Sequence, residues 1–316
     1  MKRYEKKSCH LSTGETIAYV EAGENSPGKK PLVLIHGNYS DMESFFPLIE
    51  EMENEYKIYA LDLRGFGEST YNTHARSVRT FAKDVVDFFF KKEIKDAVIL
   101  GWSFGGGVAL EAAADLAGRV KGVILLSSIS PDGYKFQFTE PVTYTMYMRA
   151  FLPITTSVFD PFVLFQEVRN LISDRKEIEK FFKELLFNVK EPSQEYLDIC
   201  VNAILKERNN VDVFEAMTSF NMSKENGAFK GSRRIQYVAC PIVQFHGEKD
   251  LVIPYMEARQ ATRLLGKKAK LVTFKNSGHA IINDEPEKLF REIRKFLNMI
   301  FLTKEELCLG DQELIG

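Results

Sequence analysis

Short apolar runs alternate with amphipathic segments over the first part of the chain, to about residue 127. Two stretches within residues 8–22 could pair as strands around Gly14. Four later apolar runs are too short for helices and end at turn residues, which favours buried strands: 31–35, 57–61, 97–100 and 123–126. Three segments between them have helical spacing: 43–53, 80–92 and 105–116. This alternation predicts a parallel sheet with helices on both faces, because parallel strands need crossover connections.

The pattern changes after about residue 130. The next stretch, 131–238, has little strand signal and is rich in Phe, Tyr and Met at helix-like spacing, so we predict a helical insertion. Its expected helices are 141–151, 161–172, 175–188, 194–206 and 211–219. Alternation then resumes with strands at 241–246 and 270–274 and helices near 255–265 and 286–301. We therefore predict a core formed by 1–130 and 239–302, the insertion at 131–238, and a C-terminal tail at 303–316.

Composition and charge narrow the class of protein. The 316 residues are 45% hydrophobic and carry a formal net charge of −2, so bulk charge favours neither a nucleic acid nor an anionic membrane as partner. The N-terminus lacks the apolar segment of a secretory signal, and no apolar run approaches the ~18 residues of a spanning helix. We expect a soluble cytoplasmic protein with reduced cysteines at positions 9, 200, 240 and 308. No histidine spacing is typical of a metal site, so we expect no metal.

The strongest local signal is GlyTrpSerPheGly at 101–105, between a predicted strand and a predicted helix. A serine in such a tight turn is forced into a strained backbone, and its neighbours two residues before and after must be small. Gly101 and Gly105 meet that need. The turn presents the hydroxyl of Ser103 at a helix N-terminus, whose dipole favours a developing anion. We predict that Ser103 is a nucleophile.

A serine nucleophile needs a base and a third group that orients the base. His279 follows the strand predicted at 270–274, so it belongs to the sheet edge where Ser103 also lies. Asp250 follows the strand predicted at 241–246, and the chain order is then serine, acid, histidine. Asp132, which follows the fourth apolar strand, is a rival for the acid. We favour Asp250 on position.

The tripeptide HisGlyAsn at 36–38 follows the first buried strand and could form an oxyanion hole. The backbone N–H groups of Asn38 and Phe104 are the expected donors to the developing oxygen anion. We expect His36 to anchor this loop rather than take part in the reaction. Trp102 and Tyr39 are candidates for the substrate pocket, although Trp102 could point into the core instead.

Taken together and in order, five motifs resemble the α/β-hydrolase superfamily, over residues 16–127 and 239–300. They are HisGlyAsn at 36–38, AspLeuArgGlyPheGlyGluSer at 62–69, GlyTrpSerPheGlyGly at 101–106, GluLysAsp at 248–250 and SerGlyHis at 277–279. The resemblance implies a mostly parallel eight-stranded sheet, no cofactor, and a helical cap over the active site formed by 131–238. Serine at position 103 argues against the haloalkane dehalogenases and epoxide hydrolases of this superfamily, which use aspartate there. HisGlyAsn with GlyTrpSer is similar to acyl-homoserine lactone hydrolases of the fold.

The resemblance does not choose the reaction, because this fold serves many functions. We expect a serine hydrolase that cleaves a small carboxylic ester or a lactone through an acyl-enzyme on Ser103. A thioesterase, a carbon–carbon bond hydrolase, or a ligand-binding protein without enzymatic activity is the alternative. The intact set of Ser103, Asp250 and His279 favours the enzyme. The oligomeric state does not follow from the sequence.

Overall fold

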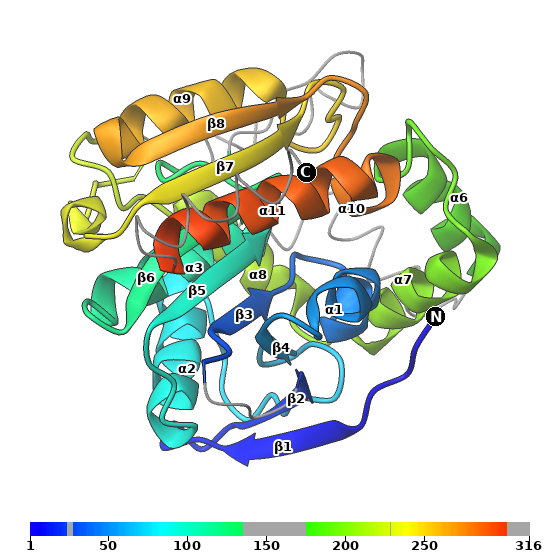
Figure 1. The fold of residues 1–316 in the computed structure, drawn as a ribbon, viewed down its shortest axis with the longest axis horizontal. Coiled ribbons are helices and arrows are strands. Elements are labelled where there is room, and N and C mark those ends of the chain that lie inside the picture. The colour runs from blue at the N-terminus through cyan, green and yellow to red at the C-terminus, as the bar shows by residue number, and fades with distance from the viewer. Residues whose placement is uncertain (24–27, 135–174, 228, 302–316) are drawn as a thin grey trace, which may run out of the picture.

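A computed structural model describes residues 1–23, 28–134, 175–227 and 229–301. Eight strands in these ranges form one sheet in the order β1-β2-β4-β3-β5-β6-β7-β8 (Figure 1). β2 pairs antiparallel with both β1 and β4, and the other pairs are parallel. The expected eight-stranded, mostly parallel sheet is confirmed. The strands are β1 (Lys6–His10), β2 (Thr16–Ala22), β3 (Pro31–Ile35), β4 (Lys57–Leu61), β5 (Ala97–Trp102), β6 (Val120–Leu126), β7 (Ile242–Gly247) and β8 (Ala269–Phe274).

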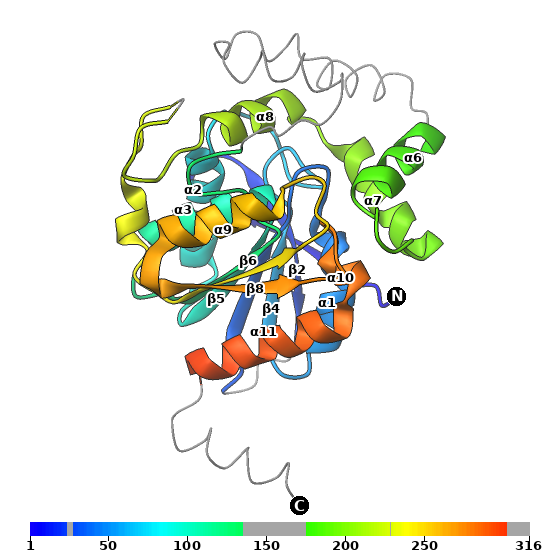
Figure 2. The ribbon, with the colours of Figure 1, turned by 90° about the horizontal axis from the view of Figure 1, so that it is seen from above.

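Helices cover both faces of the sheet (Figure 2). On one face lie α2 (Val78–Lys91), α3 (Phe104–Asp115) and α9 (Tyr255–Leu265), and on the other lie α1 (Phe46–Met52) and α11 (Pro286–Phe301). The remaining elements in the described ranges are short or inserted: η1 (Met42–Phe45), α6 (Arg175–Leu185), α7 (Gln194–Lys206), α8 (Asn210–Ser219), η3 (Arg234–Tyr237), η4 (Gly266–Lys268) and α10 (Ile281–Asp284). The helix expected at 43–53 is split into η1 and α1, because Asp41 caps η1 and a proline opens the first turn of α1.

Alternation along each central strand explains why the sheet has two buried faces. In β3, Val33 and Ile35 belong to the apolar cluster that includes α2 and α3. Leu32 and Leu34 point the other way, into the cluster that includes α1 and α11. A strand buried on both sides reads as a continuous apolar run, which is how the sequence predicted it. The parallel strands end at one edge of the sheet, so the loops after them meet there.

Three predicted helices of the insertion are confirmed as α6, α7 and α8. The segments 141–151 and 161–172 lie outside the described residues, as does the predicted tail. α7 contributes buried side chains to the apolar cluster of α1 and α11, whereas α8 contributes to that of α2 and α3. The insertion therefore packs against the core on both sides of the sheet. The domain boundaries themselves stay a prediction.

The described cysteines are free thiols: Cys9, Cys200 and Cys240 are all buried, and Cys308 lies outside the described residues. No helix in the described ranges is both long enough and apolar enough to cross a lipid bilayer. Burial raises the pKa of Cys200 and Cys240, which lowers the fraction of reactive thiolate at neutral pH.

Gly105 has no space for a side chain, and this predicts a loss of stability on substitution. A Cβ at position 105 would lie 2.3 Å from the carbonyl oxygen of Ile35 and 2.4 Å from that of His36. Backbone atoms cannot move aside as a side-chain end can, so we expect Gly105→Ala to lower the free energy of unfolding by about 1–3 kcal/mol. The measurement is denaturant-induced unfolding followed by circular dichroism.

The matched control for that substitution is Gly227→Ala. The nearest atom to a Cβ at position 227 is the Asn221 side-chain nitrogen at 4.0 Å, and this glycine does not have a positive φ. We expect its free energy of unfolding to stay within about 0.5 kcal/mol of the wild type. Equal losses in the two variants would contradict the argument from close packing.

Candidate active site

Ser103 lies in the tight turn between β5 and α3. Its φ is 54° and its ψ is −119°, and side-chain-bearing residues rarely adopt a positive φ. Its N–H donates to the carbonyl of Leu126 at 2.9 Å, and its carbonyl accepts from the N–H groups of Gly106 and Ile129 at 3.0 and 3.2 Å. These bonds hold the strained residue at the carboxyl end of β5. This is the backbone geometry of a nucleophile elbow.

Glycines bring the loop after β3 against the serine. A Cβ at Gly37 would lie 2.9 Å from the Cβ of Ser103 and 3.5 Å from its Oγ. A Cβ at Gly101 would lie 2.3 Å from the carbonyl oxygen of Gly105. This packing agrees with the sequence argument that positions 101 and 105, two residues before and after Ser103, must hold small residues. The loop that begins with HisGlyAsn therefore lies directly beside the serine side chain.

Two backbone N–H groups at this junction have no acceptor within the described part of the chain. The N–H groups of Asn38 and Phe104 donate to no residue that the structure describes. Phe104 is the first residue of α3, where backbone N–H groups lack partners within the helix. An oxygen anion bound beside Ser103 could accept hydrogen bonds from both groups. The two donors expected from the sequence are thus available for that role.

His36 joins the loop after β3 to the loop after β4. It is fully buried; its Nε2 accepts the N–H of Leu63 at 3.0 Å, and its Nδ1 donates to the carbonyl of Gly37 at 2.7 Å. Burial lowers its pKa to about 4, against the opposing effect of the Gly37 carbonyl. The ring is therefore neutral near pH 7. This contact is the loop-anchoring role expected for His36.

His279 and Asp250 form a buried pair at the same edge of the sheet. His279 Nδ1 lies 2.8 Å from Asp250 Oδ2, and both side chains are buried. A carboxylate at Nδ1 keeps the proton on that nitrogen and leaves Nε2 free to accept one. Trp102, the neighbour of Ser103, donates its indole N–H to the carbonyl of His279 at 3.3 Å. That bond brings the histidine loop next to the elbow.

The rival carboxylate makes different contacts. Asp132 Oδ1 accepts from the hydroxyl of Ser130, and its Oδ2 accepts from the side-chain amide of Gln260 at 3.0 Å. Asp250 therefore contacts His279, whereas Asp132 contacts the loop after β6 and α9. The acid favoured from the sequence is the one that contacts the histidine.

A model of the alpha/beta hydrolase family matches residues 32–292, which is most of the chain. The chain belongs to this family. It is 27% identical over 274 residues to the AB hydrolase superfamily protein YisY of Bacillus subtilis, covering 85% of this chain and 92% of that protein. It is 24% identical to a pimeloyl-(acyl-carrier protein) methyl ester esterase of Vibrio campbellii, covering 84% and 93%. An esterase from Exiguobacterium antarcticum shares the fold, with a TM-score of 0.71 at 18% identity over 93% of this chain and 100% of that one.

Asp250 of this alpha/beta hydrolase also contacts a second histidine, His246, which the sequence does not favour as the base because the loop of Asp250 follows it directly. His246 is fully buried at the end of β7; its Nε2 donates to the carbonyl of Ile253 at 2.7 Å and lies 3.3 Å from Asp250 Oδ2. Burial lowers the pKa of His246 despite the nearby carboxylate. Among the described residues, no three or more His, Cys, Asp or Glu side chains gather as a metal site.

The Asp250 carboxylate is held by donors on both oxygens. Its Oδ1 accepts the N–H groups of Val252 and Ile253, each at 2.8 Å, and its Oδ2 faces the two histidines. Burial by itself would raise the pKa of Asp250, but His279, His246 and the backbone donors outweigh burial, and the pKa lies below its usual value. The carboxylate therefore stays ionised at neutral pH.

The two pocket candidates of the hydrolase lie in different surroundings. Trp102 is 3% exposed, and its ring packs 6.1 Å from that of Phe45 in the apolar cluster of α1 and α11. The indole also lies with its ring centroid 6.2 Å from that of His279, so it contacts both the core and the histidine loop. Tyr39 is half-buried at φ 56°. Its hydroxyl donates to Asn210 Oδ1 at 3.0 Å, so it contacts the start of α8.

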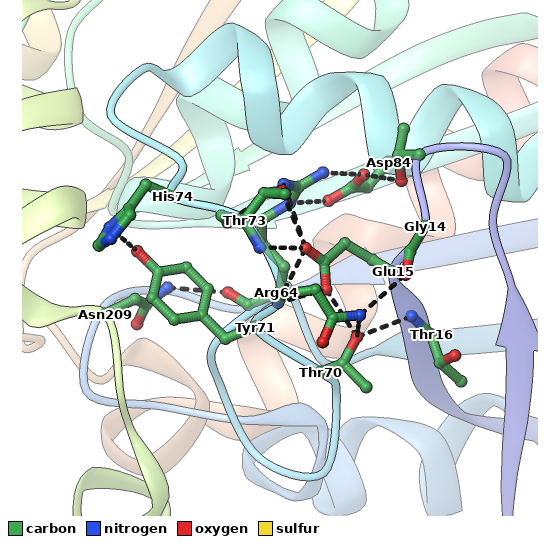
Figure 3. A network of polar contacts seen from close by, with 12 residues as sticks. Gly14, Glu15, Thr16, Arg64, Thr70, Tyr71, Thr73, His74, Asp84 and Asn209 are labelled. Atoms are coloured by element: carbon green, nitrogen blue, oxygen red, sulfur yellow. Dashed lines mark hydrogen bonds and ion pairs between the residues drawn. The ribbon is translucent and has the colours of Figure 1, made fainter.

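A buried polar network holds the loop after β4 (Figure 3). The Arg64 guanidinium donates two bonds of 2.5 Å to the carboxylate of Asp84 in α2. Glu15, from the turn between β1 and β2, accepts the N–H of Thr73 at 2.9 Å. Asn209, just before α8, donates to the carbonyl of Arg64 at 2.8 Å. In the sequence this loop is recognised only as a glycine-containing motif. In the structure it also contacts one end of the insertion, through the bond from Asn209 to Arg64.

Proposed function

We propose that this alpha/beta hydrolase cleaves a small carboxylic ester or lactone through an acyl-enzyme on Ser103. His279 takes the proton of the Ser103 hydroxyl as the oxygen attacks the carbonyl carbon. The carbonyl oxygen becomes an anion that the N–H groups of Asn38 and Phe104 bind. Asp250 orients His279 and stabilises its protonated ring. General acid–base catalysis of this kind contributes about 10²–10⁴ to the rate.

The acyl-enzyme is then resolved by water. His279 first gives its proton to the leaving alkoxide, which departs as an alcohol, or stays attached as a hydroxyl in the case of a lactone. The neutral ring then takes a proton from a water molecule, whose oxygen attacks the acyl carbon. Collapse of the second tetrahedral intermediate returns that proton to Ser103 and releases the carboxylic acid. No group beyond these side chains and water is needed for the balance of atoms.

The observation that carries the proposal is the convergence at one sheet edge. A serine with φ 54° lies in a junction where two N–H groups have no acceptor among the described residues, and a buried His279–Asp250 pair contacts the residue next to that serine. A ligand-binding protein needs neither the strain nor the hydrogen-bonded His279–Asp250 pair, so the arrangement favours an enzyme. Relatives that carry the name esterase support ester bonds as the target.

The insertion favours a small substrate. Its described part contacts both sides of the site: the Asn188 side chain donates to the carbonyl of Lys249 at 3.0 Å, beside the acid, and the Glu207 carboxylate accepts the N–H of Tyr39 at 3.1 Å. An insertion that contacts the loops on both sides of the site favours small substrates over polymers and proteins. The richness of the insertion in Phe, Tyr and Met suits an apolar acyl group. A net charge of −2 gives no steering of a highly anionic thioester such as an acyl-coenzyme A.

The test is a substrate panel run on the purified protein. It contains p-nitrophenyl esters of graded acyl length, homoserine lactones, a coenzyme A thioester and a vinylogous diketone. We expect turnover of short to medium acyl esters or of lactones, and labelling of Ser103 by a fluorophosphonate probe. Turnover of the thioester or the diketone with the simple esters untouched would overturn the substrate class. A serine that never labels would favour the ligand-binding alternative.

A further inference from the structure

The segment that joins α7 to α8 contacts the loop that carries Asn38. Glu207 is buried there, and its Oε2 accepts the backbone N–H of Tyr39 at 3.1 Å. The Asn210 side-chain oxygen accepts the hydroxyl of Tyr39 at 3.0 Å. Tyr39 is therefore held at its backbone and at its side chain by residues of the insertion. The two partners lie 168 and 171 positions further along the chain.

Tyr39 is in a backbone conformation that needs such support. Its φ is 56°, and residues with side chains keep a positive φ only where their surroundings fix it. The N–H of Tyr39 belongs to the peptide unit that begins at Asn38, so its bond to Glu207 restrains the backbone rotation at Asn38. The same bond occupies the N–H of Tyr39. The N–H of Asn38 is then the one left for a ligand beside Ser103.

We propose that Glu207 is a positioning residue for the oxyanion hole. Its carboxylate fixes the Asn38–Tyr39 peptide so that the N–H of Asn38 points to the site where the oxygen anion forms. Glu207 comes from the insertion, outside the motifs that carry the family resemblance. The insertion thus contributes to the reaction. This inference rests on the proposed ester or lactone hydrolysis at Ser103.

The position of Glu207 is itself fixed by its neighbours in the chain. The N–H of Arg208 donates to the carbonyl of Gly65 at 2.9 Å, and its guanidinium donates to the carbonyl of Gly67 at 3.1 Å. The side chain of Asn209 packs against Gly65, where a Cβ would lie 2.5 Å from it. These contacts fix the segment against the loop after β4. That loop is itself held by the polar network of Figure 3. Glu207 therefore reaches Tyr39 from a rigid base.

The experiment compares three variants in steady-state kinetics on the best ester of the panel. Glu207→Ala should lower kcat roughly 10–100-fold, because a misplacement of about 1 Å can cost 10² in rate. KM should stay within about threefold, since the lost interaction acts in the transition state. Glu207→Gln should recover most of kcat, because its amide oxygen can accept the same N–H. Arg208→Ala is the control: it removes the guanidinium bond to Gly67 but keeps the backbone bond from the Arg208 N–H to Gly65 and the packing of Asn209, which together still hold Glu207 in place. We expect its kcat to stay within about threefold of the wild type.

A second measurement separates positioning from general loosening of the insertion. The rate at which a fluorophosphonate labels Ser103 should fall in Glu207→Ala in parallel with kcat, because the phosphonyl oxygen occupies the same hole. Should Glu207→Ala fail to fold, Glu207→Met keeps the volume without an oxygen acceptor and replaces it.

Three other outcomes would contradict the role of Glu207, and they differ in what they imply for the proposed function. Equal losses of kcat in Glu207→Ala and Arg208→Ala would show that the segment only anchors the insertion, and would overturn the inference. Wild-type kcat in a folded Glu207→Ala would also overturn it, while leaving the proposed function in place. If the wild-type protein shows no hydrolysis that is lost in Ser103→Ala, both the inference about Glu207 and the proposed function are overturned.

Discussion

Ser103→Ala is expected to abolish hydrolysis while the protein remains folded. Loss of a triad serine typically lowers kcat by roughly 10⁶, and the oxyanion hole alone can leave a rate about 10³–10⁴ above that in water. Alanine tolerates the positive φ of this position no worse than serine does, and Gly37 already packs against the Cβ that the substitution keeps. The measurements are turnover of a p-nitrophenyl ester and the far-UV circular dichroism spectrum.

Ser127→Ala is the matched control for that variant. Ser127 also has a positive φ, of 42°, at the end of the neighbouring strand β6, and its buried hydroxyl has no partner among the described residues. The chemical change is the same and φ is positive at both positions, but the elbow is left intact. We expect activity within a few-fold of the wild type. If the folded Ser103→Ala variant were about as active as the Ser127→Ala variant, Ser103 could not be the nucleophile.

The sequence predicts the sheet and the elbow because both depend on local patterns. The strand Pro31–Ile35 is apolar at every position, so its burial on two faces follows without knowledge of its neighbours. GlyTrpSerPheGly likewise predicts a strained turn from the sizes of adjacent residues. His279 and Asp250 follow from the rule that parallel strands end at one edge. In each case the signal spans a few residues or one repeated topological rule.

The contacts of the insertion could not be predicted in the same way. Glu207 and Tyr39 are 168 positions apart, and neither belongs to a pattern that marks the other. The positive φ of Tyr39 is also hidden, because glycine is the residue whose presence signals such a backbone. His246 was set aside as the base for a different reason: it ends a strand, and the loop that carries Asp250 follows it directly. Such pairings depend on how the insertion folds back onto the core.

The second large effect concerns the acid. Asp250→Asn is expected to lower kcat by about 10⁴, the usual consequence of neutralising a triad carboxylate, whereas Asp132→Asn should leave kcat within a few-fold. An asparagine at position 250 has one oxygen and one NH₂ group. If the NH₂ group takes the place of Oδ2, it faces the Nδ1–H of His279 and forces the proton to Nε2. The ring then cannot accept the proton of Ser103.

The opposite orientation of the amide is no better. The NH₂ group would then take the place of Oδ1 and face the N–H groups of Val252 and Ile253, each of which lies 2.8 Å from that oxygen in the native protein. The NH₂ group would then face two N–H donors with no acceptor between them, so we expect the asparagine amide to adopt the first orientation. The reaction then fails because His279 is in the wrong tautomer. Asp132 accepts from a hydroxyl and an amide, and asparagine can still accept from either. A large loss in Asp132→Asn with Asp250→Asn unaffected would reverse the assignment, since the contact at 2.8 Å between His279 and Asp250 would then have no part in the reaction.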